Sequence, residues 1–291
     1  MSADSRAAHS IGRTARLDLR FERRRGRTVL AHSYAEPPFR TGGVFDLDGA
    51  AYVILVTSGP GIFAGDSLQV SIHVGPGATV MLTSQAALQV HPPSRPADAA
   101  RPAHSAPASA RLRHSYHVAE DAELQCHWDP VIPFAASRLD QRFEVEVAES
   151  SRLYWTDALM AGRVSRGEAW QFESLAHELR LRVGSRLAYL ERYTLTPPDD
   201  RAGRVWTSAR ATHLATVLAR HPGATRELVD ALYHRIKEEV GDGIGVDLVE
   251  PGLVVARLMG SNGASFSRAR ASYRAFALES IFGVPDRVPR K

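Results

Sequence analysis

Histidine, cysteine and the acidic residues are the side chains in this sequence that could bind a metal ion. Twelve histidines occur but only one cysteine, Cys126. His114 and His117 stand three positions apart in a segment that alternates like a strand, where residues three apart point to opposite faces. Cys126 and His127 are adjacent and diverge for the same reason. We therefore expect no tight metal site and no internal disulfide, with Cys126 as a buried small apolar residue.

The sequence lacks the patterns of nucleotide and nucleophile chemistry. Lysine occurs only at Lys237 and Lys291, and no Gly-Lys-Ser or Gly-Lys-Thr of a phosphate-binding loop is present. No Gly-x-Ser-x-Gly elbow is present either. Asp129, Asp157 and Glu168 could supply a carboxylate pair, but their separation in the sequence does not fix their distance in space. Capping of strand ends and pairing with arginine would explain these acids equally well.

Two glycine-rich segments, 58–66 and 161–168, interrupt the strand-like pattern, and each ends in an acid, Asp66 or Glu168. Their loop glycines are Gly59, Gly61, Gly65, Gly162 and Gly167. The first segment is not a dinucleotide fingerprint, because its glycine spacing differs and an alternating strand follows instead of a helix. Two tight loops, with glycines serving backbone geometry, are the default interpretation. The alternative interpretation is that Asp66 or Glu168 is a functional carboxylate.

Composition places the chain among ordinary globular proteins. Of its 291 residues, 44% are hydrophobic and 23% are charged, which excludes wholesale disorder. The net charge is only +4, and the arginines are interleaved with acids, so we do not expect nucleic-acid binding. No stretch approaches the roughly 18 apolar residues of a membrane span, and the first residues lack the apolar core of a secretory signal. We expect a cytoplasmic protein without membrane contact.

Alternation of apolar and polar residues dominates the first two-thirds of the chain and predicts short strands. Leu68 to Val74 is a clear case, and Gly75-Pro76-Gly77 turns the chain into a second strand over 78–84. Residues 52–57 form a fuller apolar run, which predicts a strand buried on both faces. The same alternation across a turn predicts further partner strands at 142–147 and 153–155, at 179–183 and 187–190, and at 17–21 and 28–31 around an arginine-rich hairpin tip.

Helical spacing of apolar residues appears late, over 225–240 and over 265–282. Residues 207–220 fit either a helix or a strand. The pattern predicts a mainly β fold of stacked antiparallel strands, as a sandwich, a barrel or a β-helical scaffold, with two helices in the C-terminal third.

A single domain over 1–291 is expected. Within it, residues 1–13 form a flexible N-terminus, and the Pro/Ala-rich residues 90–110 form a mobile loop.

Five segments follow one another in a characteristic order. They are Gly61-Ile62-Phe63-Ala64-Gly65-Asp66; Val74-Gly75-Pro76-Gly77-Ala78 with the strand ending Leu82-Thr83-Ser84; Trp128-Asp129-Pro130-Val131-Ile132-Pro133-Phe134; Gly162-Arg163-Val164-Ser165-Arg166-Gly167-Glu168; and Leu253-Val254-Val255-Ala256-Arg257-Leu258. Each is weak alone, but their order and spacing are specific. Together they resemble the urease accessory protein UreD family, called UreH in some organisms, over most of residues 14–282.

The resemblance implies a β-helical scaffold with two helices that is not an enzyme. Proteins of this family bind UreF, which recruits the GTPase UreG, and the assembly docks on the urease apoprotein subunits. Nickel then passes to the urease dinuclear site, through water-filled tunnels proposed in UreD. The resemblance therefore implies no tightly bound cofactor, with Ni²⁺ only in transit.

Asp66, Thr83, Ser84 and Glu168 match family positions associated with that passage, so the resemblance makes them tunnel candidates. A conduit must admit an ion and also release it. Carboxylates and hydroxyls suit this task, because thiolates or clustered imidazoles would hold Ni²⁺ too tightly.

The two expected helices are our candidates for the surface that faces UreF, with Glu238 and Glu239 exposed on the first of them. Their apolar stripes would otherwise simply pack on the β body.

Two other functions stay open on the residues alone. A β-helical carbohydrate-active enzyme would need two acids at a fixed short distance in an aromatic-lined groove, and aromatic residues are only 8% of the chain. A free-standing nickel-binding metallochaperone would need a tight site, against which the dispersed histidines argue.

Overall fold

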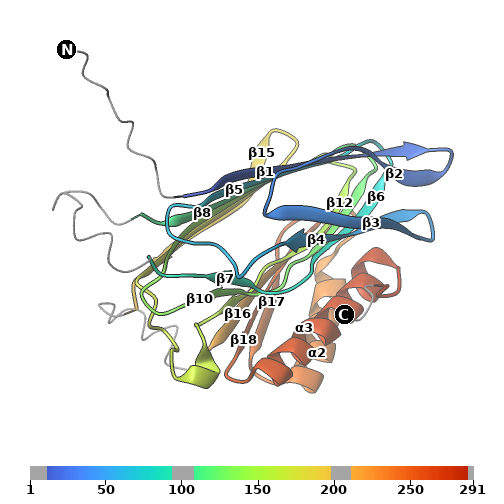
Figure 1. Ribbon diagram of the computed structural model, residues 1–291. Coiled ribbons are helices and arrows are strands. Elements are labelled where there is room, and N and C mark those ends of the chain that lie inside the picture. Colours follow the sequence, from blue (N-terminus) through green and yellow to red (C-terminus); the bar gives the residue numbers. More distant parts are fainter. Residues whose placement is uncertain (1–11, 94–107, 198–210, 288–291) are drawn as a thin grey trace, which may run out of the picture.

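Two β-sheets pack face to face, and two helices lie against the outer face of the second sheet (Figure 1). The computed structural model describes residues 12–93, 108–197 and 211–287. The prediction of a mainly β fold with two helices near the end is confirmed. Most of the predicted N-terminal segment 1–13 and of the predicted loop 90–110 lies outside the described residues, and the single domain stays a prediction.

Seven strands form the first sheet. In spatial order they are β15 (Arg186–Leu195), β14 (Ser174–Val183), β11 (Arg138–Val147), β8 (Ala110–Val118), β5 (Ser67–Val74), β1 (Thr14–Arg24) and β2 (Arg27–Ala35). The four inner pairs are parallel. The two outer pairs, β14–β15 and β1–β2, are antiparallel hairpins, so the predicted hairpins at both places are confirmed.

The second sheet has 11 strands and is also mixed. Its path is β3 (Phe39–Leu47), β4 (Ala50–Thr57), β6 (Thr79–Ser84), β9 (Glu123–His127), β12 (Arg152–Thr156), β16 (His213–Arg220), β13 (Leu159–Met160), β10 (Val131–Pro133) and β7 (Leu88–Val90). Beside β16 lies β18 (Leu253–Gly260), which pairs with β17 (Ile244–Glu250). The pairs β4–β6, β6–β9 and β9–β12 are parallel, whereas β3–β4, β12–β16 and β17–β18 are antiparallel.

The chain changes sheet between successive long strands: β5, β8 and β11 lie in the first sheet, and β6, β9 and β12 in the second. The turn Gly75-Pro76-Gly77 therefore leads from one sheet to the other and closes no hairpin. Our prediction that these strands stack as antiparallel partners is wrong for β5–β6 and for β11–β12. Alternation marks the buried face of a strand, and both sheets of a sandwich bury one face, so the pattern does not identify the partner.

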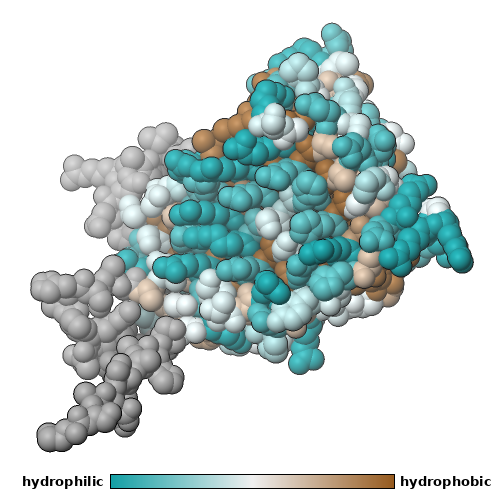
Figure 2. Space-filling model, turned by 90° about the horizontal axis from the view of Figure 1, so that it is seen from above, coloured by the Kyte–Doolittle hydropathy of each residue, from teal (hydrophilic) through white to brown (hydrophobic). Residues whose placement is uncertain are grey.

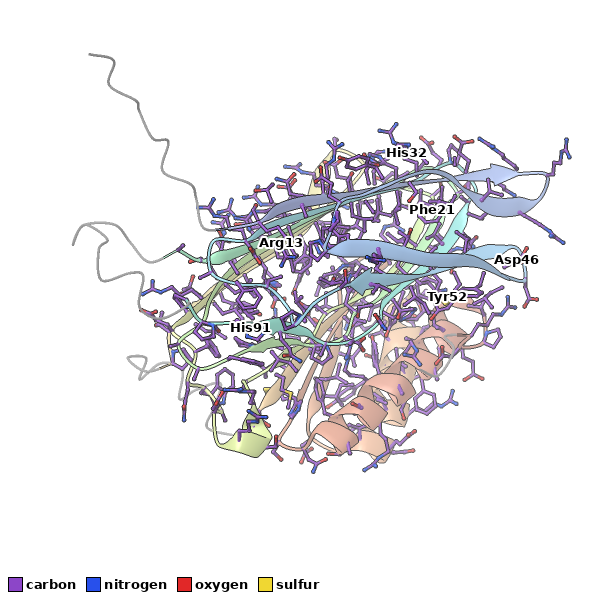
Figure 3. All side chains as sticks on the ribbon, viewed as in Figure 1. Arg13, Phe21, His32, Asp46, Tyr52 and His91 are labelled. Carbon is purple, nitrogen blue, oxygen red and sulfur yellow. The ribbon has the colours of Figure 1, made fainter. Side chains whose placement is uncertain are left out.

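The main core lies between the sheets, where side chains fill the space (Figure 3). Every second residue of β1 points into it, including the fully buried Leu17 and Leu19. Trp155 of β12 is also fully buried and meets Phe143 of β11 edge-on, with ring centroids 5.2 Å apart. The residues between them point away from the core, so the outward face of the first sheet carries mostly polar side chains.

The outer face of the first sheet is covered by rows of hydrophilic side chains (Figure 2). Arginines pair there with acids of the same or neighbouring strands. Arg113 Nη2 lies 2.6 Å from Asp140 Oδ2, and Glu178 accepts from Nε of both Arg180 and Arg192. Exposed pairs of this kind contribute about 0–1 kcal/mol each. Their arrangement favours our interpretation of the arginines as partners of neighbouring acids.

The helices lie where helical spacing predicted them. Helix α2 (Arg226–Val240) begins after Thr225, and α3 (Gly263–Ala277) begins after Asn262; each of these residues accepts a backbone N–H with its side chain. A π-helical turn, η3 (Leu278–Phe282), continues α3. Their buried residues form a second core with the outer face of the second sheet. No helix among the described residues is long and apolar enough to cross a membrane.

Two less regular regions are also settled. The described part of the ambiguous segment 207–220 is a strand, since β16 occupies a central place between β12 and β18. A short 3-10 helix, η2 (Val164–Arg166), lies within the second glycine-rich segment.

All five loop glycines adopt a positive φ, as expected for glycines that serve backbone geometry. At Gly61 the chain also passes very close to β7: Ile62 N donates to Gln89 O, and a Cβ on Gly61 would lie 2.2 Å from that oxygen. Around Gly59, by contrast, a Cβ would meet nothing within 4 Å.

Replacing Gly61 by alanine should therefore lower the free energy of unfolding by about 3 kcal/mol or more, because a steric clash adds to backbone strain. Gly59→Ala is the matched control and should lose only about 1–2 kcal/mol, from strain alone. Urea denaturation measures both. Equal losses would show that close approach to β7 does not determine the choice of glycine.

Candidate functional site

Two cavities, each with some exposed residues in its lining, share one lining residue, Asp157. The larger one, of about 360 Å³, lies against β15, β16 and the β17–β18 hairpin, and we call it the hairpin-side cavity. The smaller one, of about 220 Å³, lies beside residues 59–61, and we call it the loop-side cavity. Asp157 is thus the residue at which the two cavities come nearest to each other in their linings.

Strand ends of the second sheet position the acids of the loop-side cavity. Asp129 and Asp157 follow shortly after β9 and β12, which are parallel neighbours, so both acids leave the same edge of the sheet. Ser84 ends β6 on the other side of β9. Ser84 Oγ lies 2.9 Å from Asp129 Oδ2 and accepts the backbone N–H of Asp129, also at 2.9 Å. This reciprocal pair fixes one oxygen-rich corner of the cavity.

Polar side chains cross the apolar interior next to Asp157. Gln141 of β11 and His177 of β14 are register partners, with Gln141 Nε2 2.7 Å from His177 Nδ1. His177 Nδ1 also lies 3.8 Å from Asp157 Oδ2. The buried atoms Gln141 Oε1 and His177 Nε2 have no hydrogen-bond partner in the described part of the chain. Because Gln141 Nε2 donates to His177 Nδ1, the neutral ring carries its proton on Nε2. Gln141 Oε1 therefore suits a water molecule or a passing cation, whereas His177 Nε2 suits an acceptor such as water.

Burial sets the charge of these groups. It lowers the pKa of His177 to about 4 and that of His114, which lines the loop-side cavity, to about 3. It raises the pKa of Asp157 to about 6, against the hydrogen bond from Thr216 N and the positive charge of Arg270. At neutral pH both imidazoles are therefore uncharged, whereas Asp157 is mostly ionised.

A second polar cluster surrounds Glu191 of β15 in the hairpin-side cavity. Its carboxylate accepts from Thr216 Oγ1 at 3.3 Å and from Arg257 Nη2 at 3.1 Å. Tyr193, two residues along the same strand, stacks on His177 with ring centroids 4.7 Å apart. Polar groups thus continue from Asp157 and His177 into the larger cavity.

Asp66, a predicted tunnel residue, anchors the first glycine-rich loop. Its Oδ1 accepts from Arg13 N at 2.8 Å and its Oδ2 from Phe63 N at 2.9 Å. Arg13 and His91 lie at the same end of the sandwich, opposite the end that carries Asp46 (Figure 3). The buried Asp66 does not line either cavity.

Thr83 and Ser84 were predicted together, but adjacent residues of a strand face opposite ways. Ser84 lines the loop-side cavity. Thr83 is fully buried on the other face of the second sheet, on the side of Tyr52, and its Oγ1 donates to Ser84 O at 2.8 Å. Of these two predicted residues, the structure brings Ser84 to the cavity.

Glu168 lies in the second glycine-rich segment, outside the lining of either cavity. It binds the Arg163 guanidinium in a bidentate ion pair, with Arg163 Nε 2.7 Å from its Oε2. The hydrogen bonds from Arg163 hold the pKa of Glu168 below its usual value. Trp170, two residues later, does line the hairpin-side cavity.

Sequence reasoning missed Gln141, His177 and His114 as site residues. Each interrupts an apolar face: Gln141 stands between Leu139 and Phe143, and His177 between Leu175 and Leu179. A polar side chain on the buried face of a strand is the signal that could have found them.

The donor set of the two cavities consists of separate carboxylates, hydroxyls, amides and one neutral imidazole, that of His114. No group of three or more His, Cys, Asp or Glu residues arranged to hold a metal ion occurs among the described residues. Cys126, the soft ligand of the chain, is buried in the main core. Such dispersed oxygen and nitrogen atoms can contact a divalent cation briefly and let it go.

Comparison with known proteins matches residues 13–291 to the family model described as UreD urease accessory protein. The chain is 32% identical over 160 residues to "Urease accessory protein UreD" of Trichodesmium erythraeum, covering 54% of each chain. It is 32% identical over 221 residues to the protein of that name in Sorangium cellulosum, covering 75% of this chain and 65% of the relative. The matches thus span less than two-thirds of the length of these two relatives.

A third similarity extends over nearly the whole length. The chain is 25% identical over 281 residues to "Urease accessory protein UreD" of Deinococcus radiodurans, covering 96% of this chain and 95% of the relative. With the family model matched from residue 13 to the end, the chain belongs to the UreD urease accessory protein family.

Proposed function

We propose that this protein is a urease maturation factor, a non-catalytic scaffold and nickel conduit. In this role it links the UreF–UreG GTPase complex to apo-urease, so that Ni²⁺ reaches the urease active site. Membership of the UreD family supports the role in urease maturation. The observation that carries the conduit is the pair of cavities that share Asp157 as a lining residue.

The proposed path runs through both cavities. In the loop-side cavity the ion meets the oxygens of Ser84 and Asp129. Near Asp157 it meets that carboxylate, and Gln141, whose Oε1 is free among the described residues, also lines the loop-side cavity. In the hairpin-side cavity it meets the cluster around Glu191. Each stage offers one or two weak ligands, which allows an ion to enter and to leave.

The surface that we propose for UreF lies on the two helices. Glu238 and Glu239 of α2 are exposed, as a partner surface requires. Glu239 is held by a hydrogen bond from Ser272 Oγ of α3, so the two helices present one continuous surface. The apolar stripes of both helices face the second sheet instead. We propose this charged surface as the docking site for UreF.

The rival functions receive less support. A carbohydrate-active enzyme needs an aromatic-lined groove that holds a sugar chain, whereas Asp129 and Asp157 line a pocket of about 220 Å³ with mostly aliphatic and small residues. A metallochaperone needs a tight site, and the donor atoms here are dispersed along two cavities.

Asp157→Asn tests the conduit in a reconstituted activation of apo-urease with UreF, UreG, GTP and Ni²⁺. Loss of this carboxylate should lower the nickel content of urease about tenfold, the effect of roughly 1.4 kcal/mol of lost attraction for the ion. Mass spectrometry of the purified urease measures the metal.

Glu168→Gln is the comparison variant, because Glu168 lies outside both cavities. It should leave the nickel content unchanged. If Glu168→Gln gave nickel-poor urease while Asp157→Asn gave normal urease, the ion would take a path outside the two cavities.

The same Asp157→Asn variant has a predicted effect on stability. The folded-state pKa of about 6 lies above the ordinary 3.8, so folding disfavours ionisation, and this cost is present above pH 6 and disappears towards pH 4. The variant should therefore be more stable than the parent by on the order of 3 kcal/mol at pH 7.5. Chemical denaturation at pH 7.5 and pH 4 checks this; a gain independent of pH would contradict a buried charge.

Glu238→Lys tests the docking surface. Reversing this exposed charge should abolish co-purification with UreF, because like charges would face each other where opposite charges met. Glu146→Lys on the outer face of the first sheet is a matched reversal of an exposed glutamate and should not affect co-purification. Retention of UreF by the Glu238 variant would place its docking site elsewhere.

A further inference from the structure

Arg270 of α3 reaches from the helical layer to the strand ends that carry the two cavity acids. Its Nη2 donates to Trp128 O at 2.8 Å and lies 3.4 Å from Thr156 Oγ1. Trp128 directly precedes Asp129, and Thr156 directly precedes Asp157. The guanidinium therefore bonds to uncharged oxygens of the residues that directly precede Asp129 and Asp157.

The position of Arg270 is held by packing. Neighbouring Phe266, Ala269 and Tyr273 of α3 are buried in the second core, and the Arg270 guanidinium lies 6.0 Å from the centre of the Phe266 ring. A side chain on a packed helix keeps its distance from the strand ends better than one on a loop does.

The positive charge of Arg270 is permanent and acts on both acids. Burial lowers its pKa, but a guanidinium stays protonated at physiological pH. Asp157 and Asp129 both attract this charge, and the charge in turn stabilises the ionised form of Asp157. A cation that comes near Asp157 therefore competes with a fixed cation for the same carboxylates.

We propose that Arg270 is a built-in counter-charge that limits how tightly Asp129 and Asp157 hold a divalent cation. It is a positioning residue for the carboxylates and does not bind the ion. Without it, less positive charge would oppose the binding of a divalent cation at Asp157, on which Arg257 also acts. This inference rests on the proposed conduit, because weak retention matters only if the ion must leave.

Arg274 offers a matched control. It stands one turn further along the same helix and is similarly placed, but its Nη2 pairs with Asp286 Oδ2 at 2.8 Å. Its charge therefore has a carboxylate partner away from the two cavities.

Equilibrium dialysis of the full chain against Ni²⁺ tests the proposal. Arg270→Gln should lower the dissociation constant about tenfold, the equivalent of roughly 1.4 kcal/mol. Arg270→Lys keeps the charge, and Arg274→Gln leaves it in place, so both should bind like the parent. In the double variant Arg270→Gln/Asp157→Asn the gain should be lost, because the carboxylate that Arg270 compensates is gone.

Arg270→Met, which keeps the aliphatic stem against Phe266, replaces the glutamine variant if thermal unfolding shows that the latter does not fold. Unchanged Ni²⁺ binding in the folded charge-free variant overturns the proposal, as does an equal gain in Arg274→Gln. These outcomes are separate from a failure of the conduit, which would appear as normal nickel delivery to urease by Asp157→Asn.

Discussion

The desolvation of polar groups between two apolar sheet faces is the constraint on which the structure of the interior depends. A carboxylate or an imidazole placed there loses its water, and it persists only where other polar groups replace part of that hydration. The hydrogen bond from Thr216 N and the positive charge of Arg270 stabilise the ionised form of Asp157. The ring of His177 has a hydrogen bond with Gln141 in place of one with water. Buried polar groups such as Gln141 and Asp157 accordingly lie beside other polar groups along the linings of the two cavities.

Much of the fold could be predicted from local patterns. Alternation located the strands, and helical spacing with caps located α2 and α3, because these signals depend on which side of an element is buried. Strand partners were predictable only where a hairpin joins them, as in β1–β2 and β14–β15. The turn after β5 contains the glycines and proline of a hairpin, yet it crosses to the opposite sheet, and β5 pairs with β1 and β8.

The candidate site was predictable only in part. Of the four tunnel candidates that the family resemblance implies, Ser84 lines the loop-side cavity. Asp66, Thr83 and Glu168 lie outside both linings, and their place in a tunnel stays a prediction. Asp129 and Asp157 were recognisable as acids after strands, although only the parallel pairing of β9 and β12 brings them to one edge. Gln141 and His177 meet through tertiary register, which no local pattern contains.

The winding of the chain between the sheets has a consequence for how the protein is made. Gln141 and His177 are 36 positions apart, and contacts of such separation require a long loop to close before any stabilisation returns. A partly synthesised chain therefore exposes the unpaired edges of two incomplete sheets, which is the condition under which chains associate wrongly. The antiparallel hairpins β1–β2 and β14–β15 cap the first sheet at both edges, and the second of them is translated only after every inner strand of that sheet.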